Sequence, residues 1–154
     1  MSRFKKILLG LFGSLIIIQF IRPGRNKSDQ VLATDFTKIF SVPADVQSVL
    51  QNTCYDCHSN NTHYPWYFNI QPVAWIMASH IKNGRKELNF SEFGNYTQRR
   101  QASKLKDIAD QVKDGEMPLS SYKLMHRNAR LSEDQKVLFV NWMKKMSDSL
   151  SSGE

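Results

Sequence analysis

The chain has 154 residues, of which 41% are hydrophobic, 23% charged and 11% aromatic. These values fit one globular domain, and they exclude a collagen-like or wholly disordered chain. Most of the net charge of +7 lies at the N-terminus, because residues 1–27 contain six basic and no acidic residues. The rest of the chain is nearly neutral, so the charge gives no reason to expect binding to DNA or RNA.

The N-terminus is predicted to be a membrane-targeting element. An apolar run at residues 7–21 follows the basic residues Arg3, Lys5 and Lys6, which is the order found in export signals. As a helix the run spans about 22 Å, or about 27 Å when it starts at Phe4, against a hydrocarbon core about 30 Å thick. No small-x-small cleavage site lies close behind the run. We therefore expect an uncleaved N-terminal membrane anchor helix, with a cleaved signal peptide as the alternative.

These features divide the chain into three parts. Residues 1–22 are the predicted signal or anchor helix, residues 23–36 a polar linker, and residues 37–150 the functional domain. The domain is expected on the periplasmic side of the inner membrane, either anchored by the helix or exported in soluble form.

Helical periodicity recurs in the domain, and strand alternation is nowhere sustained. Pro43 and Pro72 are suited to the first turns of two helices, and Gly84 is predicted to end the second. Ser132 and Gln135 form a capping box at the start of the last helix. The predicted helices cover residues 43–52, 72–84, 97–113 and the segment from 132 onward. The fold class is therefore all-α: about four short helices joined by long aromatic loops, at residues 59–71 and 115–131, that would wrap a flat apolar cofactor.

The sequence Cys54-Tyr-Asp-Cys57-His58 has the C-x-x-C-H pattern of c-type haem attachment. Two thiols at this spacing can reach the two vinyl groups of a porphyrin as thioethers, and the adjacent histidine then lies under the iron. The second ring nitrogen of such a histidine normally needs an acceptor, for which a backbone carbonyl of residues 60–65 is our candidate. A redox dithiol or disulfide and a zinc site are the alternatives. A redox dithiol would be expected within a βαβ pattern, which is absent here. A structural zinc site would be expected to show a second pair of closely spaced Cys or His residues, which is also absent.

The sixth iron ligand is predicted to be Met117, which lies in Gly-Glu-Met-Pro. The following proline holds the loop extended, and a thioether ligand raises the reduction potential, as an electron carrier requires. His80, on the apolar stripe of its predicted helix, is the second candidate. Met125 or His126 comes third, and an open sixth position is the remaining alternative.

This arrangement of motif, Met-Pro and flanking helices resembles class I cytochrome c. A closer resemblance, to the bacterial haem-binding domain family best known from Bacteroidetes-type bacteria, rests on three stretches. They are Cys-Tyr-Asp-Cys-His-Ser-Asn-Asn-Thr-His-Tyr-Pro-Trp-Tyr at 54–67, Asn-Phe-Ser-Glu-Phe-Gly at 89–94 and Gly-Glu-Met-Pro-Leu at 115–119. The resemblance implies a small c-type cytochrome domain over residues 35–149, with one haem c attached through Cys54 and Cys57 and His58 as proximal ligand.

The function expected from these observations is single-electron transfer by a mono-haem c-type cytochrome that is not itself an enzyme. Its partners would be redox donor and acceptor proteins of the periplasm or inner membrane, and the membrane through the N-terminal helix. One alternative is a peroxidase-like enzyme or haem sensor with an open sixth position, in which His80 acts as an acid or base. The other is a haem-free disulfide or dithiol binding module.

Overall fold

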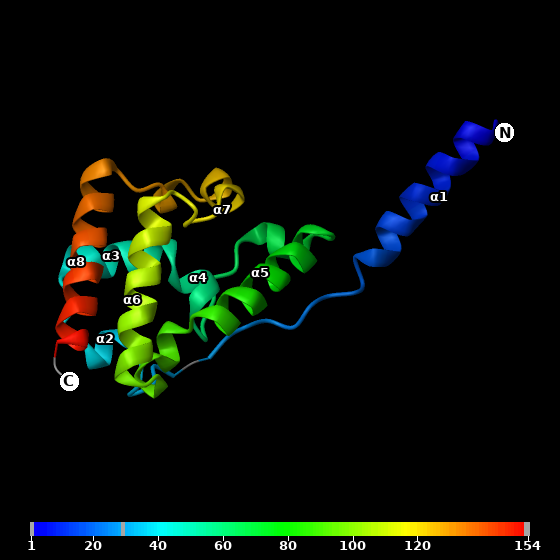
Figure 1. Cartoon of the computed structure of the whole chain (residues 1–154). Coiled ribbons are helices and arrows are strands. Elements are labelled where there is room, and N and C mark those ends of the chain that lie inside the picture. The colour runs from blue at the N-terminus through cyan, green and yellow to red at the C-terminus, as the bar shows by residue number, and fades with distance from the viewer. Residues whose placement is uncertain (1, 29, 153–154) are drawn as a thin grey trace.

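The computed structural model describes residues 2–28 and 30–152, and every regular element in them is helical (Figure 1). This confirms the all-α class. The α-helices are α1 (Arg3–Ile18), α2 (Phe36–Ile39), α3 (Ala44–Thr53), α4 (Tyr55–His58), α5 (Val73–Glu87), α6 (Gln98–Lys113), α7 (Ser120–Met125) and α8 (Glu133–Ser151). Three 3₁₀ segments complete the fold: η1 (Trp66–Asn69), η2 (Phe90–Asn95) and η3 (Arg127–Ala129).

The four helices predicted for the domain correspond to α3, α5, α6 and α8. The side chain of Thr97 caps α6, and Ser132 with Gln135 forms the predicted capping box of α8. The predicted end of α5 at Gly84 is wrong, because the helix continues to Glu87. Gly84 instead lies inside the helix, at a point where another segment approaches closely. The long loops also contain short helices, η1 in the first and α7 with η3 in the second.

The core lies between α6, α8 and the short segments packed across them. Helices α6 and α8 run antiparallel and side by side (Figure 1), and the buried Ser147 hydroxyl of α8 donates to the Ala102 carbonyl of α6 at 2.8 Å. The largest fully buried side chains come from α2, α3, η2, α6 and α8: Phe36, Leu50, Phe90, Phe93, Leu105, Phe139 and Met143. Phe90 and Phe139 of this core also line the site described below.

The predicted N-terminal membrane anchor is wrong. Among residues 2–28 and 30–152, no helix combines the length and the apolar character that a membrane span requires. Helix α1 has only 16 residues and includes Arg3 and Lys5, so it extends roughly 24 Å against a core of about 30 Å. It ends at Ile18, short of Ile21, the last residue of the apolar run. The side chain of Gln19, the next residue, hydrogen-bonds to the Leu15 carbonyl and to the backbone of residue 71.

Helix α1 projects away from the domain (Figure 1), and none of its described residues is buried. The segment after it behaves differently, because it is hydrogen-bonded to the domain. The Ile21 carbonyl accepts from the Trp75 indole at 2.9 Å. The side-chain amide of Asn26 donates to the Ser59 carbonyl at 2.8 Å and to the Thr62 hydroxyl at 2.9 Å. Part of the segment expected to be a linker therefore lies along the first long loop.

Candidate functional site

The Cys54–His58 segment forms one helical turn directly after α3. The Cys54 amide closes α3 by donating to the Leu50 carbonyl, and the Cys54 carbonyl then accepts from the amides of Cys57 and His58 at 3.2 and 3.0 Å. Residues three and four positions apart in a helix share a face. The turn therefore gathers the two thiols and the imidazole on one side, where all three line the same cavity.

Aromatic packing against Phe90 holds this turn in place. The Tyr55 ring stacks on Phe90 with 5.2 Å between centroids, and its hydroxyl donates to the Asp35 carboxylate at 3.1 Å. Burial and the neighbouring Asp35 raise the pKa of Tyr55, so the hydroxyl keeps its proton and remains a donor. The His58 ring meets the same Phe90 edge-on at 6.4 Å. One buried phenylalanine thus supports both the turn and its histidine.

The His58 ring is oriented by two backbone carbonyls of α5 and its C-terminal end. Nδ1 lies 2.9 Å from the Gly84 oxygen and 3.1 Å from the Leu88 oxygen. Since both partners are acceptors, Nδ1 carries the hydrogen, and Nε2 keeps its lone pair for a metal. Burial lowers the pKa of His58, which favours the neutral ligand form. The acceptor predicted within residues 60–65 is therefore wrong, and α5 supplies it instead.

The close crossing of α4 and α5 depends on Gly84. A Cβ atom at this position would lie 2.8 Å from the Cys57 carbonyl oxygen, which is shorter than any ordinary contact. The absence of a side chain lets α5 approach until its carbonyls reach the His58 ring. Gly84 therefore serves the site twice, through its missing side chain and through its oxygen.

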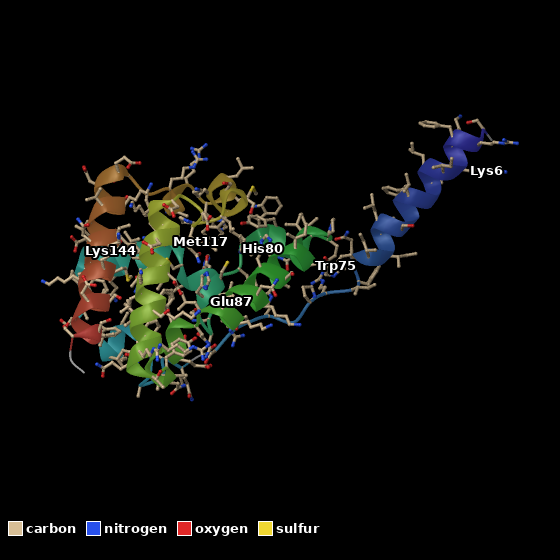
Figure 2. All side chains as sticks on the ribbon, viewed as in Figure 1. Lys6, Trp75, His80, Glu87, Met117 and Lys144 are labelled. Atoms are coloured by element: carbon tan, nitrogen blue, oxygen red, sulfur yellow. The ribbon has the colours of Figure 1, made fainter. Side chains whose placement is uncertain are left out.

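The cavity in front of the turn has a volume of about 440 Å³. It extends between α4, α5, α6 and the segment before α7, and Figure 2 shows Met117, His80 and Glu87 in this region. Both predicted sixth ligands, Met117 and His80, line it together with the two cysteines and His58. Its apolar lining includes Leu88, Phe90, Ile108, Val112, Leu119, Leu131 and Phe139.

The remaining candidates lie elsewhere. Met125 and His126 line a second, smaller cavity of about 160 Å³, on which Cys57, His80 and Tyr122 also border. The His63 backbone amide donates to the Asp56 carboxylate at 2.9 Å. The structure therefore brings Met117 and His80 to the cavity of the motif and places the third-ranked candidates beside it.

Several lining residues had not been singled out from the sequence. Helix α6 contributes Lys104, Asp107, Ile108 and Gln111, whose spacing of i, i+3, i+4 and i+7 marks one helical face. That signal was present in the sequence, although most of these residues are polar. Tyr122 and Glu87 also line the cavity, and no local pattern points to either of them.

The two thiols are protonated in this environment. Both cysteines are free and partly buried, and burial raises the pKa of each thiol to about 11. The Asp56 carboxylate adds to the effect at Cys57. Cys54 Sγ also lies 3.1 Å from the Thr53 hydroxyl. Neutral thiols of raised pKa are poor metal ligands and slow redox dithiols at pH 7.

The residues around the cavity fit a haem group. The volume lies in the range of about 300–1,000 Å³ typical of small-molecule sites. Apolar side chains such as Leu88, Phe90 and Phe139 suit the faces of a porphyrin, while Glu87 and the polar residues of α6 add charged and polar groups to the lining. The donor set combines two thiols, an imidazole with a free Nε2 and the thioether of Met117. Among the described residues no group of three or more His, Cys, Asp or Glu side chains is arranged to hold a bare metal ion.

Comparison with known proteins supports haem binding. Neither curated proteins nor solved structures gave a match. The family model for a haem-binding domain matches residues 13–145, which is most of the chain and includes every residue of the cavity. The chain therefore belongs to the haem-binding domain family.

Proposed function

We propose that this protein is a mono-haem c-type cytochrome that carries single electrons. The observation that supports it most is that Cys54, Cys57, His58 and Met117 line one apolar cavity. Covalent attachment through both thiols, with His58 and Met117 as iron ligands, would use all four. When bound, the haem supplies a one-electron iron couple.

The protein's own residues would tune that couple. The Gly84 and Leu88 carbonyls hold the His58 ring and fix its tautomer, which keeps the ligand in one orientation during electron transfer. The apolar lining excludes water and lowers the local dielectric. A thioether from Met117 would stabilise ferrous iron and raise the potential. In this role the protein is a carrier, and its partners are a redox donor and a redox acceptor.

We also propose that the protein works in the periplasm. The basic residues before an apolar helix are those of an export signal, for which 7–15 apolar residues suffice. Donor and acceptor would then be proteins of the periplasm or of the periplasmic face of the inner membrane.

A second candidate function is favoured by His80. This side chain is exposed and borders both cavities, so it is placed to move a proton if the sixth iron position is open. That arrangement would suit a peroxidase-like enzyme or a haem sensor.

Visible spectra of the oxidised and reduced protein test these proposals. The full chain would be produced in a host with c-type haem maturation, beside Met117→Ala, His80→Ala and the matched control Met125→Ala. We expect covalently retained haem in all four proteins and loss of the sulfur-ligand signature in Met117→Ala alone. A high-spin parent that Met117→Ala leaves unchanged would support the open-site function. A colourless parent would overturn both functions and leave a disulfide or dithiol module.

A further inference from the structure

Tyr122 connects the two walls of the haem-binding cavity. It lies in α7, five positions after Met117, and borders the cavity itself. Its hydroxyl donates to Asp56 Oδ2 at 2.7 Å. Asp56 stands between the two cysteines of the motif, so one hydrogen bond joins segments that are 66 residues apart in the chain.

The acceptor is held in place from its other side. Asp56 Oδ1 accepts from the His63 amide at 2.9 Å, and the Asp56 backbone carbonyl accepts from the Thr62 hydroxyl at 2.7 Å. The carboxylate therefore has a defined position before Tyr122 reaches it. A hydroxyl that donates to a carboxylate makes a short, charge-assisted bond. Burial and the Asp56 charge raise the pKa of Tyr122, so the donor proton stays on the hydroxyl.

The rest of α7 is largely exposed. None of its residues is buried, and Leu124 and Met125 are 70% and 55% exposed. The Tyr122 ring is the part of α7 that is packed: it stacks on His126 with 4.0 Å between centroids. His126 in turn shares a hydrogen bond with the buried Tyr67 hydroxyl at 3.1 Å. Other bonds hold this segment from the side of η3 and α6: Arg130 Nε donates to the Lys123 carbonyl at 3.0 Å, and the Met117 backbone amide donates to the Gln111 carbonyl at 3.2 Å. Tyr122 is the α7 side chain that reaches the Cys54–His58 turn.

We propose that Tyr122 is a positioning residue: its hydrogen bond to Asp56 fastens α7, and with it the Met117 segment, against the Cys54–His58 turn. Without the bond, residues 115–126 would open more often and expose the cavity to small molecules. The placement of Met117 as an iron ligand rests on the proposed function, whereas the fastening of α7 does not.

The test compares Tyr122→Phe with the parent in the haem-loaded full chain. This substitution keeps the ring and removes only the hydroxyl. Tyr96→Phe is the matched control, because the Tyr96 hydroxyl also takes part in one hydrogen bond, which it accepts from the Asn89 backbone amide at 3.2 Å. Tyr96 does not border the cavity. The two readouts are amide hydrogen exchange of residues 115–126 and the rate at which cyanide binds to the ferric protein.

We expect Tyr122→Phe to raise both the exchange rate and the cyanide rate by about tenfold, which is the size expected for loss of a hydrogen bond to a charged group. The sulfur-ligand signature should weaken as well. Tyr96→Phe should change none of the three. In an Asp56→Ala background, Tyr122→Phe should have no further effect, because its partner is already gone.

Unchanged exchange of residues 115–126 in Tyr122→Phe would overturn the inference, as would full additivity with Asp56→Ala. Failure of the proposed function would give a different result from failure of this inference. A parent without a sulfur-ligand signature would overturn the assignment of Met117, while faster exchange in Tyr122→Phe would still support the fastening of α7.

Discussion

At the residue scale, the two cysteines of the site differ from ordinary thiols before any haem is attached. Burial raises the pKa of each to about 11, compared with about 8.5 for a free cysteine. Because the thiolate is the reactive form, the folded haem-free chain should react slowly with alkylating reagents. A raised thiol pKa also slows disulfide formation.

We therefore expect alkylation of the reduced, haem-free chain at pH 8 to be roughly 100-fold slower when it is folded than when it is unfolded in urea. The rate should rise as the pH passes from 9 toward 11. The folded pKa lies above the unfolded one, so the stability that the protonated thiols contribute is complete below about pH 8.5. It is lost as the pH rises through about 11. Mass spectrometry of quenched samples measures the rates, and equal rates in the folded and unfolded chain would contradict this assignment.

At the element scale, the orientation of His58 depends on how closely α4 and α5 cross. Gly84→Ala places a Cβ atom 2.8 Å from the Cys57 carbonyl, so the two helices must move apart. We expect the free energy of unfolding to fall by about 1–3 kcal/mol, the usual cost of overpacking, partly offset by the better helix propensity of alanine. Denaturant unfolding of the haem-loaded protein measures it.

Gly13→Ala is the matched control for this prediction. Gly13 lies inside α1, and a Cβ atom there would meet nothing within 4 Å. We expect a free energy of unfolding equal to that of the parent. If both substitutions have the same effect, the close crossing at Gly84 does not contribute to stability.

Local patterns in the sequence were sufficient for the long helices and for the donor set. Periodicity and capping residues located α3, α6 and α8, since these signals lie within one helix. The C-x-x-C-H spacing also predicted three of the four residues proposed to hold the haem, because a single helical turn gathers them. Met117 was predicted from its loop, and the cavity accommodates it together with His80.

The errors arose where a local signal competes with a contact across the fold. Gly84 has the appearance of a helix stop, but the approach of α4 requires a glycine within α5. The acceptor for His58 was expected nearby in sequence, whereas it lies 26 and 30 residues away. Tyr122 and Asp56 are paired only by tertiary packing. The apolar run at the N-terminus appeared long enough to consider a membrane span, but the helix ends at Ile18.

At the scale of the whole molecule, the N-terminal region divides into a helix that contacts little and a segment that is part of the domain. No described residue of α1 is buried. Residues 19–26, by contrast, share hydrogen bonds with the segment between α4 and α5 through Gln19, Ile21, Arg25 and Asn26. The stability of the domain should therefore depend on the second part and not on the first.

Two truncations test this division, each produced behind a cleavable export signal and loaded with haem. Removal of residues 1–18 should leave the free energy of unfolding unchanged. Removal of residues 1–27 should lower it by about 2–4 kcal/mol, since several hydrogen bonds, each worth about 0.5–1.5 kcal/mol, are lost together. Asn26→Ala in the full chain removes only the side-chain amide that bonds Ser59 and Thr62. It should lower the free energy of unfolding by part of the amount lost on removal of residues 1–27. Equal stability of the two truncated proteins would show that residues 19–27 behave as a free linker, and the domain would then begin at α2.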